Sequence, residues 1–178
     1  MIWESHYWKD DLLRHARFLR KKRKPGDWSD LDVVKLEKAI LLGFYTIRKL
    51  IEAEKIATRF KTHEIDVVSY PPSGRAVTRM NWHKIDILYD FDSPRSERRL
   101  LPFLADQAIH SFVFQHAVGE DGEFEGILLA SDRQRKKSLL QISADSIIDV
   151  FTDIGKNYPA TGRYILNPAT GDYDVHSE

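Results

Sequence analysis

The stretch LLPFLADQAIHSFVFQHAV, residues 100–118, determines the fold class that the sequence predicts. It contains enough apolar residues to cover nearly every face of a helix, and a helix of that kind has to be packed on several sides. Pro102 suits the first turn of such a helix, where its missing N–H is harmless. We therefore predict a buried helix over residues 100–118.

A polar pair, Asp106 and His110, lies within this apolar stretch at a spacing of four residues. On a helix this spacing places both side chains on one face, close enough to pair. Burial without hydrogen-bond partners would be costly, so we expect the pair to be satisfied inside the protein or to line a cavity. A carboxylate that orients an imidazole can serve general acid–base chemistry. It can equally serve as an internal polar contact between helices.

A second apolar stretch, AILLGFYTI at residues 39–47, predicts the central helix of the fold. Ser29 is a good N-cap and Asp32 completes a capping box, so we place this helix near residues 29–59. Gly43 in mid-helix is unfavourable relative to alanine, which predicts either that another backbone passes close to it or that the glycine is simply tolerated there.

Arg48 follows the most apolar part of this central helix. If the two long helices pack antiparallel, its guanidinium can reach the carboxylate of Asp106. The alternative is a surface ion pair with Glu52, one helical turn further on.

The predicted fold class is α+β and mainly α: a helical bundle around two long central helices, with short β-hairpins appended. We expect one domain over residues 1–178, in which residues 1–118 form the helical core. The remaining predicted elements are a helix over residues 3–24, a short hairpin near 64–78, a short helix over 82–89, a hairpin from 127–130 and 138–142, a helix over 143–155, and an irregular tail.

Composition limits the possible functions. Lys plus Arg and Asp plus Glu both number 27 among the 178 residues, so no global field draws the protein to nucleic acid or membrane. The absence of cysteine excludes disulfides, thiolate zinc sites and thiol nucleophiles. The charged N-terminus MIWESHYWKDD and the lack of a long apolar run predict a cytoplasmic protein without a membrane partner.

One further polar cluster, His83, Asp86 and Asp90, could suggest a metal site. Its spacing matches no established ligand signature, and helix capping and solvation account for these side chains. We therefore predict no metal and no cofactor.

Two basic clusters could contact phosphate groups of RNA or DNA. Their alternative roles are to complement a helix C-terminus and to solvate a turn. The first basic cluster comprises residues 20–24 and the second lies within residues 133–137; the candidate residues are Arg20, Lys21, Lys22, Arg23, Lys24, Arg133, Arg135, Lys136 and Lys137.

Four segments carry a resemblance to small, uncharacterised bacterial proteins. They are GFYTIRKLIEA at residues 43–53, NWHKID at 81–86, IHSFVF at 109–114 and SDRQR at 131–135. The chain also resembles in outline the HEPN superfamily, helical bundles with an RNase or RNA-binding site. The usual HEPN motif, an arginine separated from the histidine by four to six residues, is missing before His110.

The HEPN resemblance implies a bacterial, nucleic-acid-associated protein that binds or cleaves RNA in a toxin or defence setting. In that hypothesis His110 is the general acid or base, Asp106 orients it, and Arg48 stabilises developing charge. The alternative is a non-enzymatic interaction protein, either a homodimer or a subunit of a complex, in which Asp106 and His110 only stabilise the interior.

Overall fold

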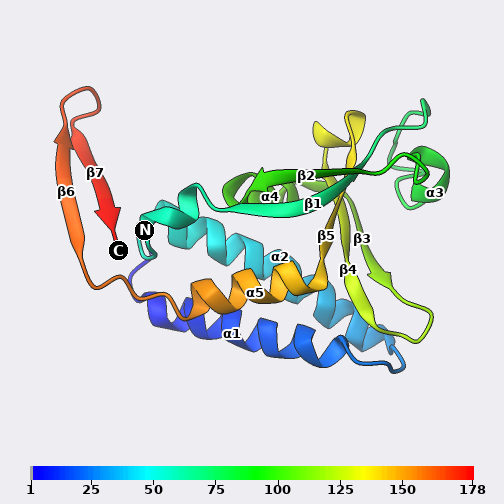
Figure 1. Cartoon of the computed structure of the whole chain (residues 1–178), viewed down its shortest axis with the longest axis horizontal. Helices are drawn as coiled ribbons and strands as arrows, with labels where there is room; N and C mark the ends of the chain where they lie inside the picture. The colour runs from blue at the N-terminus through cyan, green and yellow to red at the C-terminus, as the bar shows by residue number, and fades with distance from the viewer. Residues whose placement is uncertain (1) are drawn as a thin grey trace.

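The computed structural model describes residues 2–178 and contains a five-stranded antiparallel sheet with four helices packed on one face (Figure 1). The strand order is β2-β1-β5-β4-β3, and a separate two-stranded sheet pairs β6 with β7. The helices are α1 (Ser5–Lys22), α2 (Asp30–Glu52), α3 (Ile85–Leu88), α4 (Leu101–Ile109) and α5 (Ala144–Gly155), with 3-10 turns η1 (Thr58–Lys61) and η2 (Gln134–Lys136). The strands are β1 (Glu64–Tyr70), β2 (Arg95–Leu100), β3 (Ser111–Val118), β4 (Phe124–Ser131), β5 (Leu139–Ser143), β6 (Gly162–Asn167) and β7 (Asp172–Ser177).

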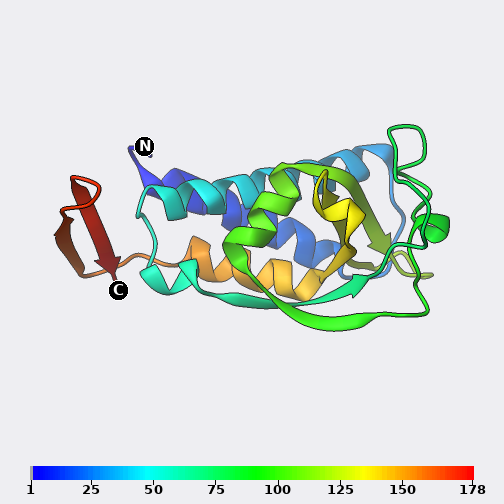
Figure 2. The same cartoon turned by 90° about the horizontal axis from the view of Figure 1, so that it is seen from above.

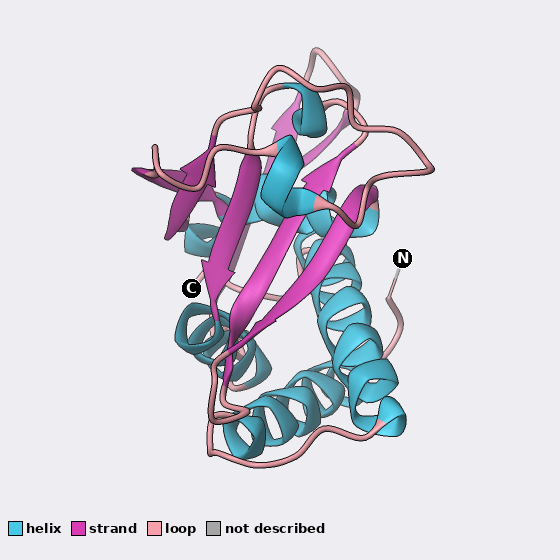
Figure 3. Cartoon of the chain, turned by 90° about the vertical axis from the view of Figure 1, so that its right-hand side faces the viewer, coloured by secondary structure: helices cyan, strands magenta, loops and turns pink. Residues whose placement is uncertain are grey.

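The main core lies between the sheet and the helices. Alternate strand residues such as Ile65, Leu129 and Leu140 pack against apolar residues of α1, α2, α4 and α5. A smaller core on the helix-free face joins Val113 and Leu139 of the sheet to the loop over residues 71–84 and to α3. Figures 2 and 3 show the helical layer from above and the helix-free face, with loops and short helical turns crossing one end of the strands.

The predicted helical bundle with appended hairpins is wrong. About 41% of the chain is helical and 27% is strand, and the sheet forms one entire side of the core. The error lies in residues 100–118, which the structure divides into α4 and β3. Phe112, Val113 and Phe114 favour a strand, and pairing with β4 satisfies the backbone of β3 along most of its length. An apolar run of this kind satisfies helical and strand periodicity alike.

Several predicted elements are confirmed. The first helix forms as α1, and α2 begins at the predicted capping box, in which Ser29 Oγ accepts from the Asp32 N–H at 3.2 Å. The hairpin of β4 and β5 and the Ser143-capped helix α5 also form. Helix α2 ends at Glu52, short of the predicted end at residue 59, because the chain turns at Glu54, whose φ is +54°.

Two predictions of local strand structure are wrong. The hairpin near residues 64–78 does not form, because β1 pairs with β2 and β5 and the chain after Pro71 crosses the helix-free face as a loop. The tail is not irregular throughout, because β6 and β7 form a hairpin.

Gly43 has a packing role, but its neighbour is a side chain and not the expected backbone. A Cβ at this position would lie 2.2 Å from the ring of Phe151 in α5. Glycine therefore lets α2 and α5 approach each other. Across residues 2–178, none of the helices combines the length and apolar character needed to cross a membrane.

Candidate nucleic-acid interface

The structure brings Arg48 and Asp106 together as an ion pair between α2 and α4. The same guanidinium donates through Nε to Glu52 Oε1 at 2.6 Å, so both predicted partners of Arg48 are used. The side chains of Arg48 and Asp106 are 36% and 43% exposed. Asp106 is therefore only partly buried: its Oδ1 is shielded from solvent, while the side chain as a whole is accessible and takes part in a shared ion-pair cluster.

His110 does not join this pair. Its residue is the C-cap of α4 and is exposed, because the helix ends at Ile109 and does not continue through an apolar environment. Within residues 2–178 its imidazole makes no hydrogen bond or ion pair; only its backbone N–H is engaged, donating to the Asp106 carbonyl at 3.0 Å. Within residues 2–178, the Asp106 carboxylate makes no hydrogen bond with the imidazole of His110 and therefore does not orient it.

Two surface hollows lie elsewhere. One, of about 500 Å³, is on the helix-free face of the sheet and is lined by Val68, Arg98 and Gln141. The other, of about 330 Å³, lies between the N-terminal turn of α1 and the C-terminal hairpin, and is lined by Lys9 and Tyr158. Neither hollow includes Arg48, Asp106 or His110 in its wall.

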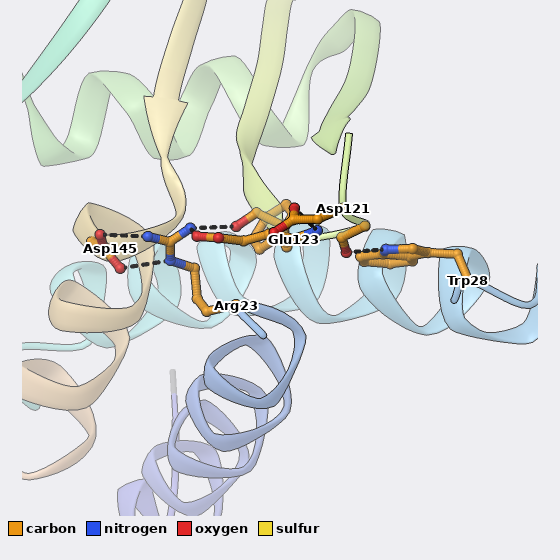
Figure 4. Close-up of polar contacts among 7 residues, drawn as sticks. Arg23, Trp28, Asp121, Glu123 and Asp145 are labelled. Atoms are coloured by element: carbon orange, nitrogen blue, oxygen red, sulfur yellow. Dashed lines mark hydrogen bonds and ion pairs between the residues drawn. The ribbon is translucent and has the colours of Figure 1, made fainter. Parts of the chain in front are cut away.

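In the first basic cluster, Arg23 connects separate segments of the chain through polar contacts (Figure 4). The guanidinium of Arg23 binds both carboxylate oxygens of Asp145, at 2.9 and 3.1 Å, and pairs with Glu123. Nearby, Trp28 Nε1 donates to the Gly122 carbonyl at 2.7 Å. These contacts tie the connection between α1 and α2 to the turn between β3 and β4 and to the start of α5.

Other cations of the first basic cluster are also engaged. Arg20 donates to Thr152 Oγ1 at 3.3 Å, and Lys22 forms an ion pair with Asp32 at 3.1 Å. Within residues 2–178, the side chains of Lys21 and Lys24 are the two in this cluster with no hydrogen bond or ion pair. The cluster therefore offers less free positive charge than its sequence indicates.

The second basic cluster also contains one anchoring arginine. Arg135 donates to Asp132 Oδ1 at 3.0 and 2.8 Å, and these hydrogen bonds hold the pKa of the Asp132 carboxyl below its usual value. Its guanidinium lies over the ring of Phe112, 4.0 Å from the centroid, and contacts the carbonyl oxygen of Val77. The Tyr89 hydroxyl donates to the Arg135 carbonyl at 3.1 Å, and burial raises the pKa of Tyr89 to about 12, so this phenol stays protonated.

Through this anchor, η2 is fixed against the loop over residues 71–84. Arg75 and Arg79 flank Val77 in that loop, each within about 7 Å of it along the chain. We name the resulting set the basic rim. It consists of Arg75, Arg79, Arg133, Lys136 and Lys137, all of them exposed and, within residues 2–178, without an ion pair.

The basic rim lies at one end of the sheet, next to two further features. His110 precedes Ser111, which pairs with Ser131 at the end of β4, so the backbone of His110 lies close to the start of the second basic cluster. The loop also carries exposed apolar side chains, Met80 at 85% and Trp82 at 38%. Aromatic faces beside cations are typical of surfaces that bind single-stranded nucleic acid.

Arg75 and Arg79 were absent from the predicted site, because the sequence placed residues 75–78 in a local hairpin. A signal for them exists in the sequence. Val77 is a β-branched apolar residue in this loop, and in the structure it is buried in the smaller core. The contacts of Val77 bring Arg75 and Arg79 towards the second basic cluster.

The cluster of His83, Asp86 and Asp90 shows no metal-binding arrangement. Over residues 2–178, His, Asp and Glu side chains do not gather in any group of three or more that could hold a metal ion. Asp90 instead accepts from the backbone N–H of Asp92 at 3.0 Å, and the His83 carbonyl accepts from Gln115 Nε2 at 2.7 Å.

Comparison of the chain with protein-family models, curated proteins and solved structures gives no significant match.

Proposed function

We propose that the protein binds single-stranded nucleic acid through the basic rim and does not cleave it. The observation that carries this proposal is the anchoring of η2 to the loop by Arg135, which gathers exposed cations from two distant segments. Five neighbouring cations supply a local positive field, which the zero net charge of the chain does not provide over the whole surface.

The main contribution to nucleic-acid affinity is expected to be electrostatic. Each neutralised phosphate of a single strand contributes a slope of about 0.7 to the dependence of log K on log salt. Use of the whole basic rim would therefore give a slope of roughly 3 to 4. Trp82 and Met80, next to the cations, offer apolar faces for bases, which favours single strands over duplexes.

Binding without cleavage fits the arrangement of Arg48, Asp106 and His110. In the catalytic hypothesis Asp106 orients the imidazole of His110, which requires a hydrogen bond between the two side chains. Here Asp106 pairs with Arg48, while His110 lies exposed at the end of α4. His110 can contribute a polar contact to a bound strand, because it borders the second basic cluster.

The two basic clusters provide a matched experiment. Fluorescence anisotropy with labelled RNA and DNA oligomers of about 20 nucleotides would be recorded between about 50 and 200 mM salt. The test variant is R133Q/K136Q/K137Q, and the control K21Q/K24Q removes cations from the first basic cluster. We expect the test variant to lose affinity by tenfold or more and to lower the salt slope by about 2. The control should stay within about twofold of the unmodified protein, because it leaves the rim intact.

Two outcomes would overturn the proposal: no binding by the unmodified protein at the lowest salt, or equal losses in the two variants. A duplex control of the same length tests the preference for single strands. Cleavage of the RNA during the measurement would contradict the non-catalytic part of the proposal.

A separate observation favours the alternative of a non-enzymatic interaction protein. Exposed apolar side chains occur near the start of the chain, at residues 3–7, and in the C-terminal segment 158–173. Binding of nucleic acid and association with protein use different ends of the molecule and can coexist.

A further inference from the structure

The C-terminal hairpin of β6 and β7 projects from the body of the protein (Figures 1 and 2). It is tied to the body at its base, where the Ser177 N–H donates to Thr58 Oγ1 at 2.8 Å and the Ser177 hydroxyl donates to the Ile56 carbonyl at 2.9 Å. A two-stranded sheet by itself is marginally stable in water. Its projecting part therefore needs further packing.

The two faces of this hairpin differ in polarity. Directly paired residues share a face, and successive residues alternate between faces. Tyr164 pairs with Val175 and Leu166 with Tyr173, which gives one apolar face. The opposite face is mainly charged or polar; it contains Arg163, Asn167, Asp172, Asp174 and His176, together with Ile165.

The apolar face is exposed and continues into the second hollow. Tyr164, Leu166 and Tyr173 are 68%, 56% and 57% exposed. Tyr164 and Val175 also line the hollow of about 330 Å³, whose wall includes Tyr158 and the first turn of α1. This surface therefore runs from the hairpin onto the body.

Exposed hydrophobic side chains concentrate at this end. Of the sixteen large hydrophobic residues that are exposed in residues 2–178, seven lie in residues 3–7 and 158–173, including Trp3 at 90% and Tyr7 at 66%. A concentration of this kind marks an interaction surface and not the ordinary scatter of apolar residues.

We propose that a second copy of the chain covers this surface in a symmetric dimer, with the apolar faces of the two hairpins packed against each other. A two-fold interface has to be self-complementary, and a face that carries Tyr, Leu and Val without charge does not repel its own copy. The charged groups of the hairpin lie on the opposite face and stay in water. A partner of opposite charge would find no charges to pair with on this face.

The available area agrees with a dimer. Aromatic side chains can each bury 150–250 Å², so the exposed parts of Tyr158, Tyr164, Leu166 and Tyr173 offer on the order of 500 Å² per copy. Two copies together would bury on the order of 1,000 Å², which is at the lower end of specific interfaces.

The hairpin itself provides a matched pair of variants. Leu166→Asp places a charge on the apolar face, and Ile165→Asp places the same charge on the opposite face of the same strand. Light scattering coupled to size-exclusion chromatography, at about 100 µM protein and on dilution, would give the molar mass of the full chain. We expect a dimer for the unmodified protein and for Ile165→Asp, and a monomer for Leu166→Asp. Circular dichroism and the melting temperature would show that the body stays folded.

A second variant, Tyr173→Ser, removes apolar area without adding charge and should weaken the dimer at least tenfold. A monomeric unmodified protein would overturn the proposal, and so would equal dissociation by Ile165→Asp or an intact Leu166→Asp dimer. Nucleic-acid affinity measured on the same samples is a separate readout, since the rim is at the other end of the molecule.

Discussion

The two basic clusters have similar sequences but different surroundings. In the first basic cluster, Arg23 binds Asp145 and Glu123, and its neighbours Arg20 and Lys22 are also engaged by nearby side chains. In the second basic cluster, Arg135 alone is used for anchoring, and three cations beside it stay exposed. A run of positive charge therefore indicates a candidate binding surface only where the fold leaves its cations without acidic partners.

The largest effect on stability is expected for substitution of Arg23, which we assign a structural role and no role in nucleic-acid binding. Arg23→Ala should lower the free energy of unfolding by about 2 kcal/mol, because hydrogen bonds to charged groups are lost, although water replaces part of the interaction with the exposed Asp145. Arg23→Lys keeps the charge but not the paired contacts with Asp145, and should recover roughly half of the loss. Urea denaturation measures both variants. Nucleic-acid affinity should be unchanged.

Arg135→Ala is the counterpart in the second basic cluster. It should cost about 1.5 kcal/mol in the free energy of unfolding, and it should also lower nucleic-acid affinity, because η2 and the loop over residues 71–84 lose their connection. If Arg23→Ala reduced affinity as much as Arg135→Ala, the distinction between the clusters would be wrong.

Lys9 is a third kind of cation: it is buried and, within residues 2–178, forms no ion pair with an acidic side chain. Lys9 is 1% exposed, its Nζ donates to the Lys55 carbonyl at 2.8 Å, and burial lowers its pKa to about 8, with a smaller contribution from the charge of Lys55. The unfolded chain binds this proton up to pH 10.5, so it holds more protons than the folded protein between these values. Stability from this group therefore rises with pH across that window.

The matched variant is Lys9→Met. Between about pH 7.5 and 10, the free energy of unfolding of the unmodified protein should rise by about 2 kcal/mol relative to Lys9→Met. Denaturant titrations at several pH values measure this difference. A constant difference across the window would show that the ammonium of Lys9 is not desolvated.

The smallest effect is expected at His110. His110→Ala should change the free energy of unfolding by less than about 0.5 kcal/mol, because the side chain is exposed and makes no polar contact within residues 2–178. Thermal melting and anisotropy with RNA are the measurements, and affinity should fall by no more than about twofold. Loss of an RNase activity in this variant would instead support the catalytic hypothesis.

Local signals were sufficient where a structure depends on residues close together in the chain. The capping box of Ser29 and Asp32 and the cap at Ser143 form within four residues, and both helices begin where predicted. The periodicity of α1 likewise involves one short segment.

Long-range pairing could not be predicted in this way. The strand β1 finds its neighbours at β2 and β5, and the apolar residues 111–118 become a strand because β4 is available to pair with them. For the candidate site the same reason applies. Arg75 and Arg79 come near the second basic cluster through long-range contacts of Val77, which packs in the smaller core and whose carbonyl contacts Arg135 across 58 positions of sequence.

The strand order has a consequence for synthesis of the protein. The pairs β1–β2 and β3–β4 are complete in the sequence before β5, which lies between them in the sheet and is made last of the five. Until residues 139–143 are added, the edges of β1 and β4 that β5 covers have no partner strand, and unpaired edges are prone to wrong pairing. Insertion of this one strand closes both edges, so completion of the main sheet is a late event.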